Sequence, residues 1–438
     1  MKRIYILVFI LIVFCTNLII LAPLATAIKP FIPYASYLFG TNKPATYLIL
    51  LGNDTEIRAN GGFAGSYAKV SLQSNLKRTR LTVSPIINFQ DIYVPNGQLD
   101  GYVTPPEPIQ KAFQKGSWEL ANADWEPDFP TAATSIRWFL EKGGETNPDN
   151  LLTLNLSTIK KVLDIVGSFT VSDYQAEITP ENLYLFLQGK AEVNFFPGST
   201  QKKDALTAVG NSLYKKLSSL SIRKKIQIAK LLYQDLQNQN ILINSQNPDF
   251  QAMLEKNNFA GKLTPSDQDT YLLVEANLGA NKANAYVERN TKHSISFKDG
   301  QTTHQATVHF TNSSPESNPN PPFHYGGNYI AYLRFYIPQN AQNIKIDREI
   351  VSQNPENSLD SNPIKTSSKY GLIEIGFFQT TPALNQSTLS LSYTIPTDSD
   401  KYSLSILKQH GLTTSPQTII LPNKTYTTNL EDDFKISY

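Results

Sequence analysis

The order of apolar and polar residues divides the chain into an apolar N-terminus, a region where strands alternate with helices, and a region of strands. Ile4 to Ile28 is a stretch of 25 residues without a charge, long enough to cross about 30 Å of hydrocarbon as a helix. Lys2 and Arg3 precede it, which favours an N-terminus in the cytoplasm. We therefore predict a transmembrane anchor over 1–28, with the bulk of the chain outside the cytoplasmic membrane.

A cleaved signal peptide is the alternative interpretation of this segment. Ala25-Thr26-Ala27 resembles a small-x-small cleavage site. The apolar run is longer than the roughly 7–15 residues of a signal core, so the anchor is favoured. Residues 29–44 contain three prolines and several aromatic residues, and they predict a juxtamembrane linker.

Residues 45–285 alternate between strand and helix patterns. Apolar runs or period-two alternation predict strands at 47–51, 67–73, 79–84, 150–156, 241–244 and 271–276. Apolar residues at helical spacing predict helices at 131–142, 158–166 and 204–220, and a further helix capped by Ser221. This alternation is typical of an α/β domain with a central mixed sheet.

Residues 286–438 carry short alternating runs separated by Pro, Asn and Ser clusters, with no convincing helix. This spacing is typical of a β-sandwich. The predicted fold class is therefore α/β: an N-terminal transmembrane helix, an α/β domain, and a C-terminal β-sandwich.

Composition narrows the classes of function. The net charge is +2 over 438 residues, so no basic field exists that would bind nucleic acid as a partner. The single cysteine, Cys15, excludes disulfide scaffolds and Cys-based zinc sites.

A motif after the first strand is a candidate phosphate-binding loop. It reads Glu-Ile-Arg-Ala-Asn-Gly-Gly-Phe over 56–63. Arg58 offers a fixed fork of donors for phosphate oxygens, and Asn60, Gly61 and Gly62 would let backbone N–H groups converge. The alternative is a hairpin turn, because Asn-Gly is a common turn dipeptide.

Carboxylates in two loops are candidates for metal binding and catalysis. Asp124 and Asp128 lie in an acidic Trp-containing segment, where oxygen ligands would suit a divalent ion. The alternative is that Asp128 caps the helix that follows. Asp91 and Asp100 follow a predicted strand and are the candidate catalytic residues, although turn formation explains them nearly as well.

Two further segments carry polar groups. The loop after the strand at 271–276 contains Asn277, Asn281 and Lys282, a set that would bind a polar ligand or form an ordinary turn. The helical pair carries a basic cluster at 215–225, which is either a solvated face or a contact for anionic headgroups or wall polymers.

These stretches together resemble the domain-of-unknown-function 4012 family of membrane-anchored bacterial proteins. The matching segments are YLILLGNDTEIRANGGFAGSYAKVSL, LDGYVTPPEPI, ANADWEPDFPTAA and VEANLGANKANAYVER, in this order over about 45–290. This resemblance implies no activity.

The layout is more distantly similar to the LytR–CpsA–Psr family, which transfers glycopolymers from polyprenyl-pyrophosphate carriers to the cell envelope using arginines and a magnesium ion. The segments LILLGNDTEIRANGGF and NLLTLNLSTIKKVLDIVGSFTV carry the likeness. It implies that Asp54 is a metal-side aspartate and that Arg58 binds phosphate. The family's Arg-Ser-Asp-Thr reads Arg58-Ala-Asn-Gly here, so one magnesium carboxylate is missing.

The resemblance leads to the following hypothesis. The chain is expected to act in envelope glycopolymer assembly at the cytoplasmic membrane, binding or transferring a polyprenyl-linked glycan or envelope polymer. Arg58 and Lys282 would hold phosphate. The ligands of a Mg²⁺ ion would come from the aspartates Asp54, Asp124 and Asp128. The alternative is a non-catalytic surface protein with a degenerate transferase-like domain.

Overall fold

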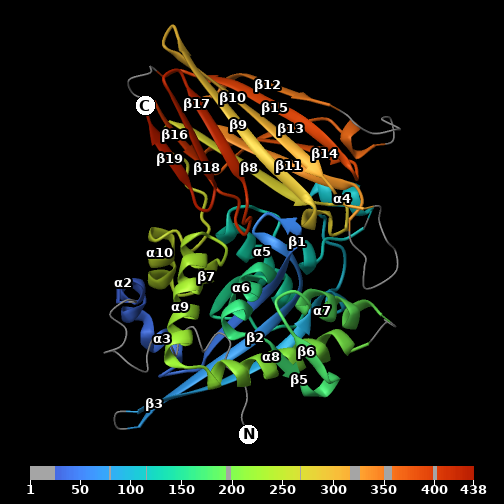
Figure 1. Cartoon of the computed structure of the whole chain (residues 1–438), viewed down its shortest axis with the longest axis vertical. Helices are drawn as coiled ribbons and strands as arrows, with labels where there is room; N and C mark the ends of the chain where they lie inside the picture. The colour runs from blue at the N-terminus through green and yellow to red at the C-terminus, as the bar shows by residue number, and fades with distance from the viewer. Residues whose placement is uncertain are drawn as a thin grey trace.

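The computed structural model describes residues 25–77, 80–114, 116–193, 199–266, 268–315, 326–349, 358–397 and 402–438. Nearly all of the expected anchor over 1–28 lies outside these ranges, so it stays a prediction. None of the helices in the described ranges has both the length and the apolar character needed to cross a membrane. Two parts are stacked along the long axis of the molecule, with helices and one sheet in one part and the strands of a sandwich in the other (Figure 1).

A five-stranded mixed sheet forms the centre of the N-terminal part, in the order β3-β2-β1-β4-β7. Strands β1 and β4 run parallel, and the other pairs are antiparallel. This confirms the expected α/β arrangement around a mixed sheet. The strands are β1 (Ala45–Arg58), β2 (Gly61–Lys77), β3 (Arg80–Asp91), β4 (Asn150–Asn155) and β7 (Ile243–Ser245).

Helices cover both faces of this sheet. Alternate residues of β1 point to opposite sides, and the residues on both sides are apolar and need to be buried. Leu48 and Leu50 pack in the core beneath helix α5, whereas Tyr47 and Ile49 share a core with α6, α8 and α9. Every helix predicted for the α/β domain is present, and where both ends were predicted they lie within three residues of the observed ones. The helices are α2 (Ala25–Ile28), α3 (Ala35–Phe39), α4 (Glu107–Phe113), α5 (Phe129–Lys142), α6 (Leu156–Val166), α7 (Leu183–Glu192), α8 (Gln201–Ser219), α9 (Ile222–Gln237) and α10 (Pro248–Lys256).

The C-terminal part is a sandwich of two six-stranded sheets, ordered β12-β15-β10-β9-β17-β18 and β13-β14-β11-β8-β16-β19. Their inner faces share one apolar core. The strands are β8 (Asp269–Asn277), β9 (Val287–Lys298), β10 (Gln301–Asn312), β11 (Tyr329–Pro338), β12 (Gln342–Arg348), β13 (Lys365–Lys369), β14 (Leu372–Thr381), β15 (Asn385–Ile395), β16 (Ser403–Ile406), β17 (Pro416–Leu421), β18 (Lys424–Asn429) and β19 (Phe434–Ser437). A separate pair, β5 (Phe169–Val171) with β6 (Ala176–Ile178), follows α6.

One strand lies in a different part of the fold from the one expected. We assigned residues 271–276 to the α/β domain, which was predicted to end at 285. The corresponding strand β8 pairs with β11 and β16 in the sandwich. A buried strand carries an almost continuous apolar run in either kind of sheet, so its pattern does not identify its partners. By strand pairing, the sandwich begins at Asp269.

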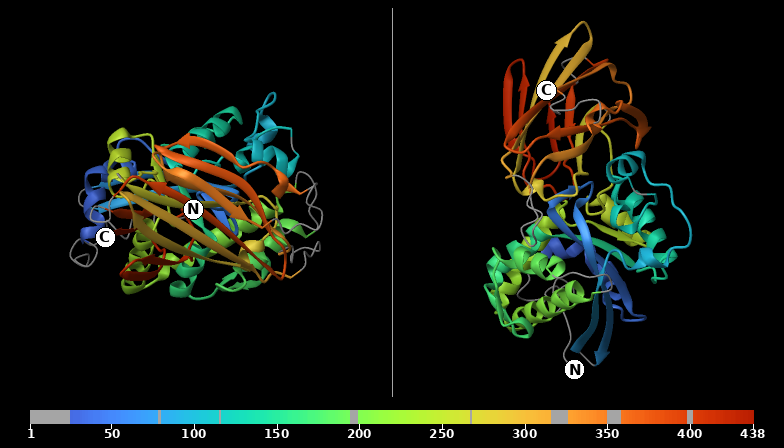
Figure 2. Two further views of the ribbon diagram at one scale, coloured as in Figure 1. Left: turned by 90° about the horizontal axis from the view of Figure 1, so that it is seen from above. Right: turned by 90° about the vertical axis from the view of Figure 1, so that its right-hand side faces the viewer.

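The acidic Trp-containing segment joins the two parts. Arg334 of β11 lies over the ring of Trp125, 4.3 Å from its centroid, and donates from Nη2 to the Trp125 carbonyl. Glu126 accepts hydrogen bonds from Lys369 and Tyr370 of the sandwich. Figure 2 shows, in its right-hand view, the sandwich and the α/β domain meeting end to end at this junction. The segment therefore holds the sandwich against the α/β domain.

Candidate functional site

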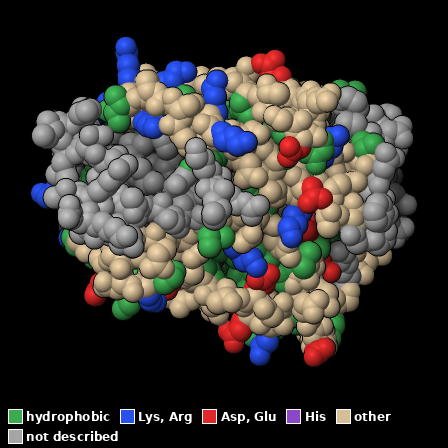
Figure 3. Space-filling model, turned by 90° about the horizontal axis from the view of Figure 1, so that it is seen from below, with side chains coloured by type: hydrophobic (Ala, Val, Ile, Leu, Met, Phe, Trp, Pro, Cys, Tyr) green, Lys and Arg blue, Asp and Glu red, His purple; other side chains and the backbone are tan. Residues whose placement is uncertain are grey.

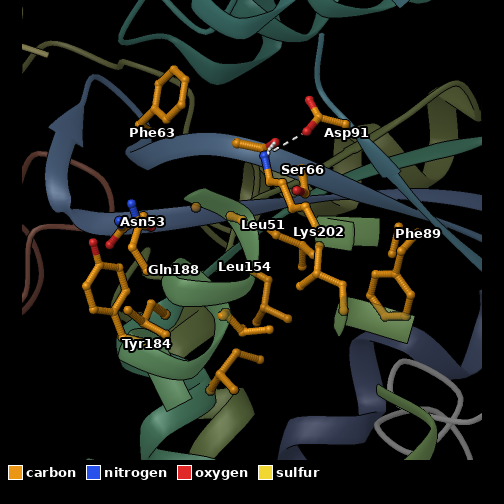
Figure 4. Close-up of a pocket in the computed structure, with 18 of the residues that line it drawn as sticks. Leu51, Asn53, Phe63, Ser66, Phe89, Asp91, Leu154, Tyr184, Gln188 and Lys202 are labelled. Atoms are coloured by element: carbon orange, nitrogen blue, oxygen red, sulfur yellow. Dashed lines mark hydrogen bonds and ion pairs between the residues drawn. The ribbon is translucent and has the colours of Figure 1, made fainter. Parts of the chain in front are cut away.

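A cavity of about 920 Å³ lies between the central sheet and the helices α6, α7 and α8. This volume is near the upper end of the ~300–1,000 Å³ range of ligand pockets. The cavity interrupts the core on the face of the sheet to which Ile49 points. Figure 4 shows Leu51 of β1, Leu154 of β4 and Phe89 of β3 projecting into it from the sheet, with α7 and α8 opposite.

Most of the wall is apolar, and it comes from every element around the cavity. The sheet contributes side chains that alternate toward this face, and the helices contribute one stripe each. These apolar residues are Ile49, Leu51, Ala68, Val70, Ile87, Phe89, Leu154, Leu156, Ile159, Leu183, Leu187, Ala191, Leu206, Val209 and Leu213. Such a wall gains free energy by contact with a hydrocarbon chain, at roughly 25 cal/mol per Å² of apolar surface removed from water.

The cavity is polar where the β1–β2 hairpin meets the loop after β8. Glu56, Arg58 and Lys282 line it there. Arg58 Nη2 donates to Glu56 Oε1 at 2.9 Å, and Lys282 Nζ donates to the other carboxylate oxygen. The two cations also lie over the Phe63 ring, 5.1 Å and 5.9 Å from its centroid. One carboxylate therefore bridges a cation of the α/β domain and a cation of the sandwich's first loop.

The guanidinium of Arg58 is almost fully used. Its Nη1 donates to the backbone carbonyls of Ile57 and Asn277, while its Nε is buried without a partner. A buried donor without an acceptor costs about 1–3 kcal/mol, so a ligand oxygen at this position would be stabilised. Arg58 both holds the domain junction and presents one donor that no described residue satisfies.

A second ion pair lies further along the polar edge of the cavity. Lys202 of α8 reaches Asp91 at the end of β3, with Nζ 3.0 Å from Oδ2 (Figure 4). The Asp91 carboxylate also accepts from the backbone N–H of Tyr93. Asp91 therefore lines the cavity, where Lys202 already pairs with it, and its catalytic role stays a prediction. The other candidate catalytic residue, Asp100, is exposed and is absent from the cavity wall.

The rest of the first motif forms a hairpin turn, which was the alternative interpretation. Arg58 pairs with Gly61 across the turn, and Gly61 has a φ of 126° that favours glycine. Asn60 donates to the Glu126 carbonyl and contacts His410. Gly62 N–H donates to Asn155. These three residues build the junction and do not line the cavity.

The amide-rich loop after β8 is also folded on itself. Asn277 donates to Asn281 and Asn284 and accepts from the N–H of Gly279. Asn281 donates to the Asn328 carbonyl. Both amides are satisfied within the protein, and only Lys282 and Ala280 of this loop reach the cavity.

The three candidate metal ligands do not come together. Asp54 accepts from the N–H of Ser157, and burial raises its pKa. Asp128 caps α5 through Thr131 and accepts from the N–H of Leu263. Asp124 is buried beside Arg58 and Arg334, and burial raises its pKa to about 6. In the described ranges, no group of three His, Cys, Asp or Glu side chains is placed to hold an ion. The expected ligand set for Mg²⁺ is thus wrong, and Mg²⁺ stays a prediction without assigned ligands.

Two functional features escaped the sequence analysis. Glu56 carried no signal of its own, because its partner Lys282 is 226 residues away. The apolar stripe of α8 was recognised at helical spacing, but that spacing is the same for a packed core and for the wall of an apolar cavity. Only the missing volume between sheet and helices tells the two apart.

Comparison with known proteins gives a family-model match over part of the chain and distant likenesses to solved structures. The family model described as "Protein of unknown function (DUF4012)" matches residues 42–191, which confirms that resemblance over this part. No curated protein matches the chain. Two solved structures are distantly similar to this chain. TagV of B. subtilis has 15% identity over 53% of this chain and 87% of that chain, with a TM-score of 0.28. Lin1025 of Listeria innocua has 12% identity over 53% of this chain and 86% of that chain, with a TM-score of 0.26. Scores this low carry no argument about activity.

Proposed function

We propose that this chain binds an amphiphile with a long apolar tail and a phosphate head, of the polyprenyl-phosphate type, and serves envelope glycopolymer assembly. The observation that carries the proposal is the cavity itself. Its wall is apolar over most of its length, and it ends at Arg58 and Lys282. A tail would fill the apolar length while its phosphate meets the two cations.

Binding is better supported than group transfer. Glu56, Arg58 and Lys282 together carry a net charge of +1, and Asp91 is paired with Lys202. Departure of a pyrophosphate would need more positive charge than this, from a metal ion or further basic residues. The proposed role is therefore to hold or present the lipid-linked substrate outside the cytoplasmic membrane, with the predicted anchor over 1–28 keeping the chain at the bilayer.

The test is native mass spectrometry of the full-length protein in mild detergent, followed by binding of polyprenyl phosphate and of the uncharged polyprenol. Leu206→Trp places an indole in the cavity and should abolish binding of both. Thr207→Trp, the matched control, adds the same ring to α8 outside the cavity wall and should leave binding unchanged.

Lys282→Gln separates the head from the tail. Because a hydrogen bond to a charged group contributes about 1.5–3 kcal/mol, this variant should bind polyprenyl phosphate about tenfold more weakly or worse. Its affinity for polyprenol should stay unchanged. If neither lipid binds the native protein, or if Leu206→Trp binds both normally, the proposal fails.

A further inference from the structure

The turn between α8 and α9 carries an uninterrupted block of positive charge. From Ala205 to Gln234 the sequence has six Lys or Arg residues and no carboxylate. The cations are Lys215, Lys216, Arg223, Lys224, Lys225 and Lys230. A block of one sign over 30 residues contrasts with the near-neutral chain as a whole, whose net charge is +2.

An apolar side chain stands at the centre of this block. Ile222 is the first residue of α9, and 41% of its surface is exposed. Lys215, Arg223 and Lys224 around it are exposed as well. The turn has a defined shape, since Ser221 caps α9 and Lys225 donates to the Ser218 carbonyl. We name Lys215 to Lys225 the basic tip.

The basic tip lies in the half of the molecule away from the sandwich, with the β2–β3 hairpin at the same end (Figure 1). Figure 3 views this end, and Lys and Arg side chains gather along one edge of the described part of the face. The segment that follows the predicted anchor packs on this half too, with Phe31 stacked on Phe259 behind α9. A membrane reached through that segment would face this half.

Helix α8 connects the basic tip with the cavity. It lines the cavity from Lys202 to Leu213, a length of about 17 Å. Lys202 lies beside the polar edge, and Lys215 follows Leu213 by two residues. The apolar part of the cavity therefore extends toward the basic tip, and the cations that would hold a phosphate lie at its other end.

We infer that the basic tip rests on an anionic phospholipid surface, with Ile222 inserted among the headgroups. Cations attract anionic lipid, and an apolar side chain between them suits the headgroup boundary. The contact itself stands on charge and exposure. Its consequence, that the cavity opens its apolar end toward the bilayer, rests on the proposed function.

The experiment uses the full chain with vesicles of phosphatidylcholine alone or with 30% phosphatidylglycerol. An environment-sensitive label is attached at Ile222→Cys in a Cys15→Ser background, and lipid-borne quenchers report insertion. We expect quenching only in the anionic vesicles, and its loss in about 1 M salt, where the Debye length falls to about 3 Å. A label at Leu384→Cys, 72% exposed on the sandwich, should show no quenching.

Charge removal completes the test. Each cation near an anionic surface contributes about fivefold to association, so removing three should lower the docking equilibrium about 100-fold. The test variant is Lys215→Gln, Arg223→Gln and Lys224→Gln, and its matched control removes three exposed cations of the sandwich, Lys292→Gln, Lys298→Gln and Lys345→Gln.

The outcomes are distinct. Equal quenching in both kinds of vesicle, or none in either, overturns the inference. A label that responds to a soluble anionic polymer and not to lipid also overturns it, and would point to a wall polymer. If Ile222 inserts as expected but no polyprenyl lipid is retained, the membrane contact stands and the proposed function fails.

Discussion

The sandwich and the α/β domain differ in the buried polar groups and the empty volume of their interiors. The sandwich contains a polar network around Asp269 in which each member has a hydrogen-bond partner, although Tyr271 Oη and two nitrogens of Arg334 elsewhere in the sandwich are buried without one. The α/β domain leaves about 920 Å³ between sheet and helices, with an unpartnered Arg58 Nε at one end. Empty volume and an unsatisfied donor both cost stability, and in the α/β domain the two coincide at one place, which is why the proposal puts the ligand there.

The network in the sandwich is a buried ion pair. Asp269 accepts from Tyr393, Tyr402 and His304. His293 lies between His304 and Gln417, whose side-chain N–H groups donate to Ser415 and leave its oxygen to accept. His293 therefore donates to Gln417 and accepts from His304. His304 then donates from both nitrogens, which makes it an imidazolium beside the Asp269 carboxylate.

Two buried aspartates make the contrast concrete. Burial alone would raise the pKa of Asp269, but the charge of His304 and the hydrogen bonds from His304 and the two tyrosines hold it below its usual range. Asp124 at the domain junction is equally buried, and its pKa rises to about 6 because Arg58 and Arg334 only partly offset the loss of water. A full set of partners, rather than burial, decides which carboxylate stays charged as the pH falls below about 6.

The largest expected effect comes from breaking the satisfied network. Asp269→Asn leaves the His304 charge buried and unpaired, which should lower the free energy of unfolding by about 3–5 kcal/mol. Urea unfolding followed by tryptophan fluorescence and circular dichroism measures it. Tyr402→Phe, which removes one of three hydrogen bonds, should cost much less. Equal losses for the two variants would contradict the ion pair.

The next effect comes from the unsatisfied aspartate. Because the folded-state pKa of Asp124 is raised, the folded state holds the proton more tightly than the unfolded state between about pH 4 and pH 6. Its contribution to stability should therefore fall as pH rises through this window, by up to about 3 kcal/mol. Asp124→Asn should remove this slope. Unfolding midpoints of both proteins from pH 4 to pH 8 give the difference, and parallel profiles would show that Asp124 does not titrate in this window.

The smallest expected effect tests the polar end of the cavity. Glu56 neutralises one of the two cations that would meet a phosphate, so Glu56→Gln should raise affinity for polyprenyl phosphate about tenfold over polyprenol. The variant should also lose stability without ligand, since Arg58 and Lys282 lose their shared anion. Thermal shifts with each lipid measure both. A larger shift with polyprenol than with the phosphate would show that Glu56 does not compete with the head.

The sequence by itself determined most of the local structure. Apolar spacing placed the helices α5, α6, α8 and α9, and alternating runs indicated a β-sandwich over 286–438, because a face that must be buried repeats with the period of its element. For two polar motifs, the local alternative interpretation was the correct one: Asn60-Gly61 forms a turn, and Asp128 caps α5. These outcomes depend on neighbours within a few residues.

The tertiary structure alone decided which groups meet. Glu56 pairs with Lys282, which is 226 residues away, and Trp125 lies under Arg334, which is 209 residues away. Strand β8 pairs with strands of the sandwich and not with the sheet of the α/β domain that precedes it in the sequence. No periodicity encodes such pairings, because they depend on how whole layers stack. The cavity is the clearest case: its lining reads as ordinary core along the chain, and only the distance between sheet and helices leaves it hollow.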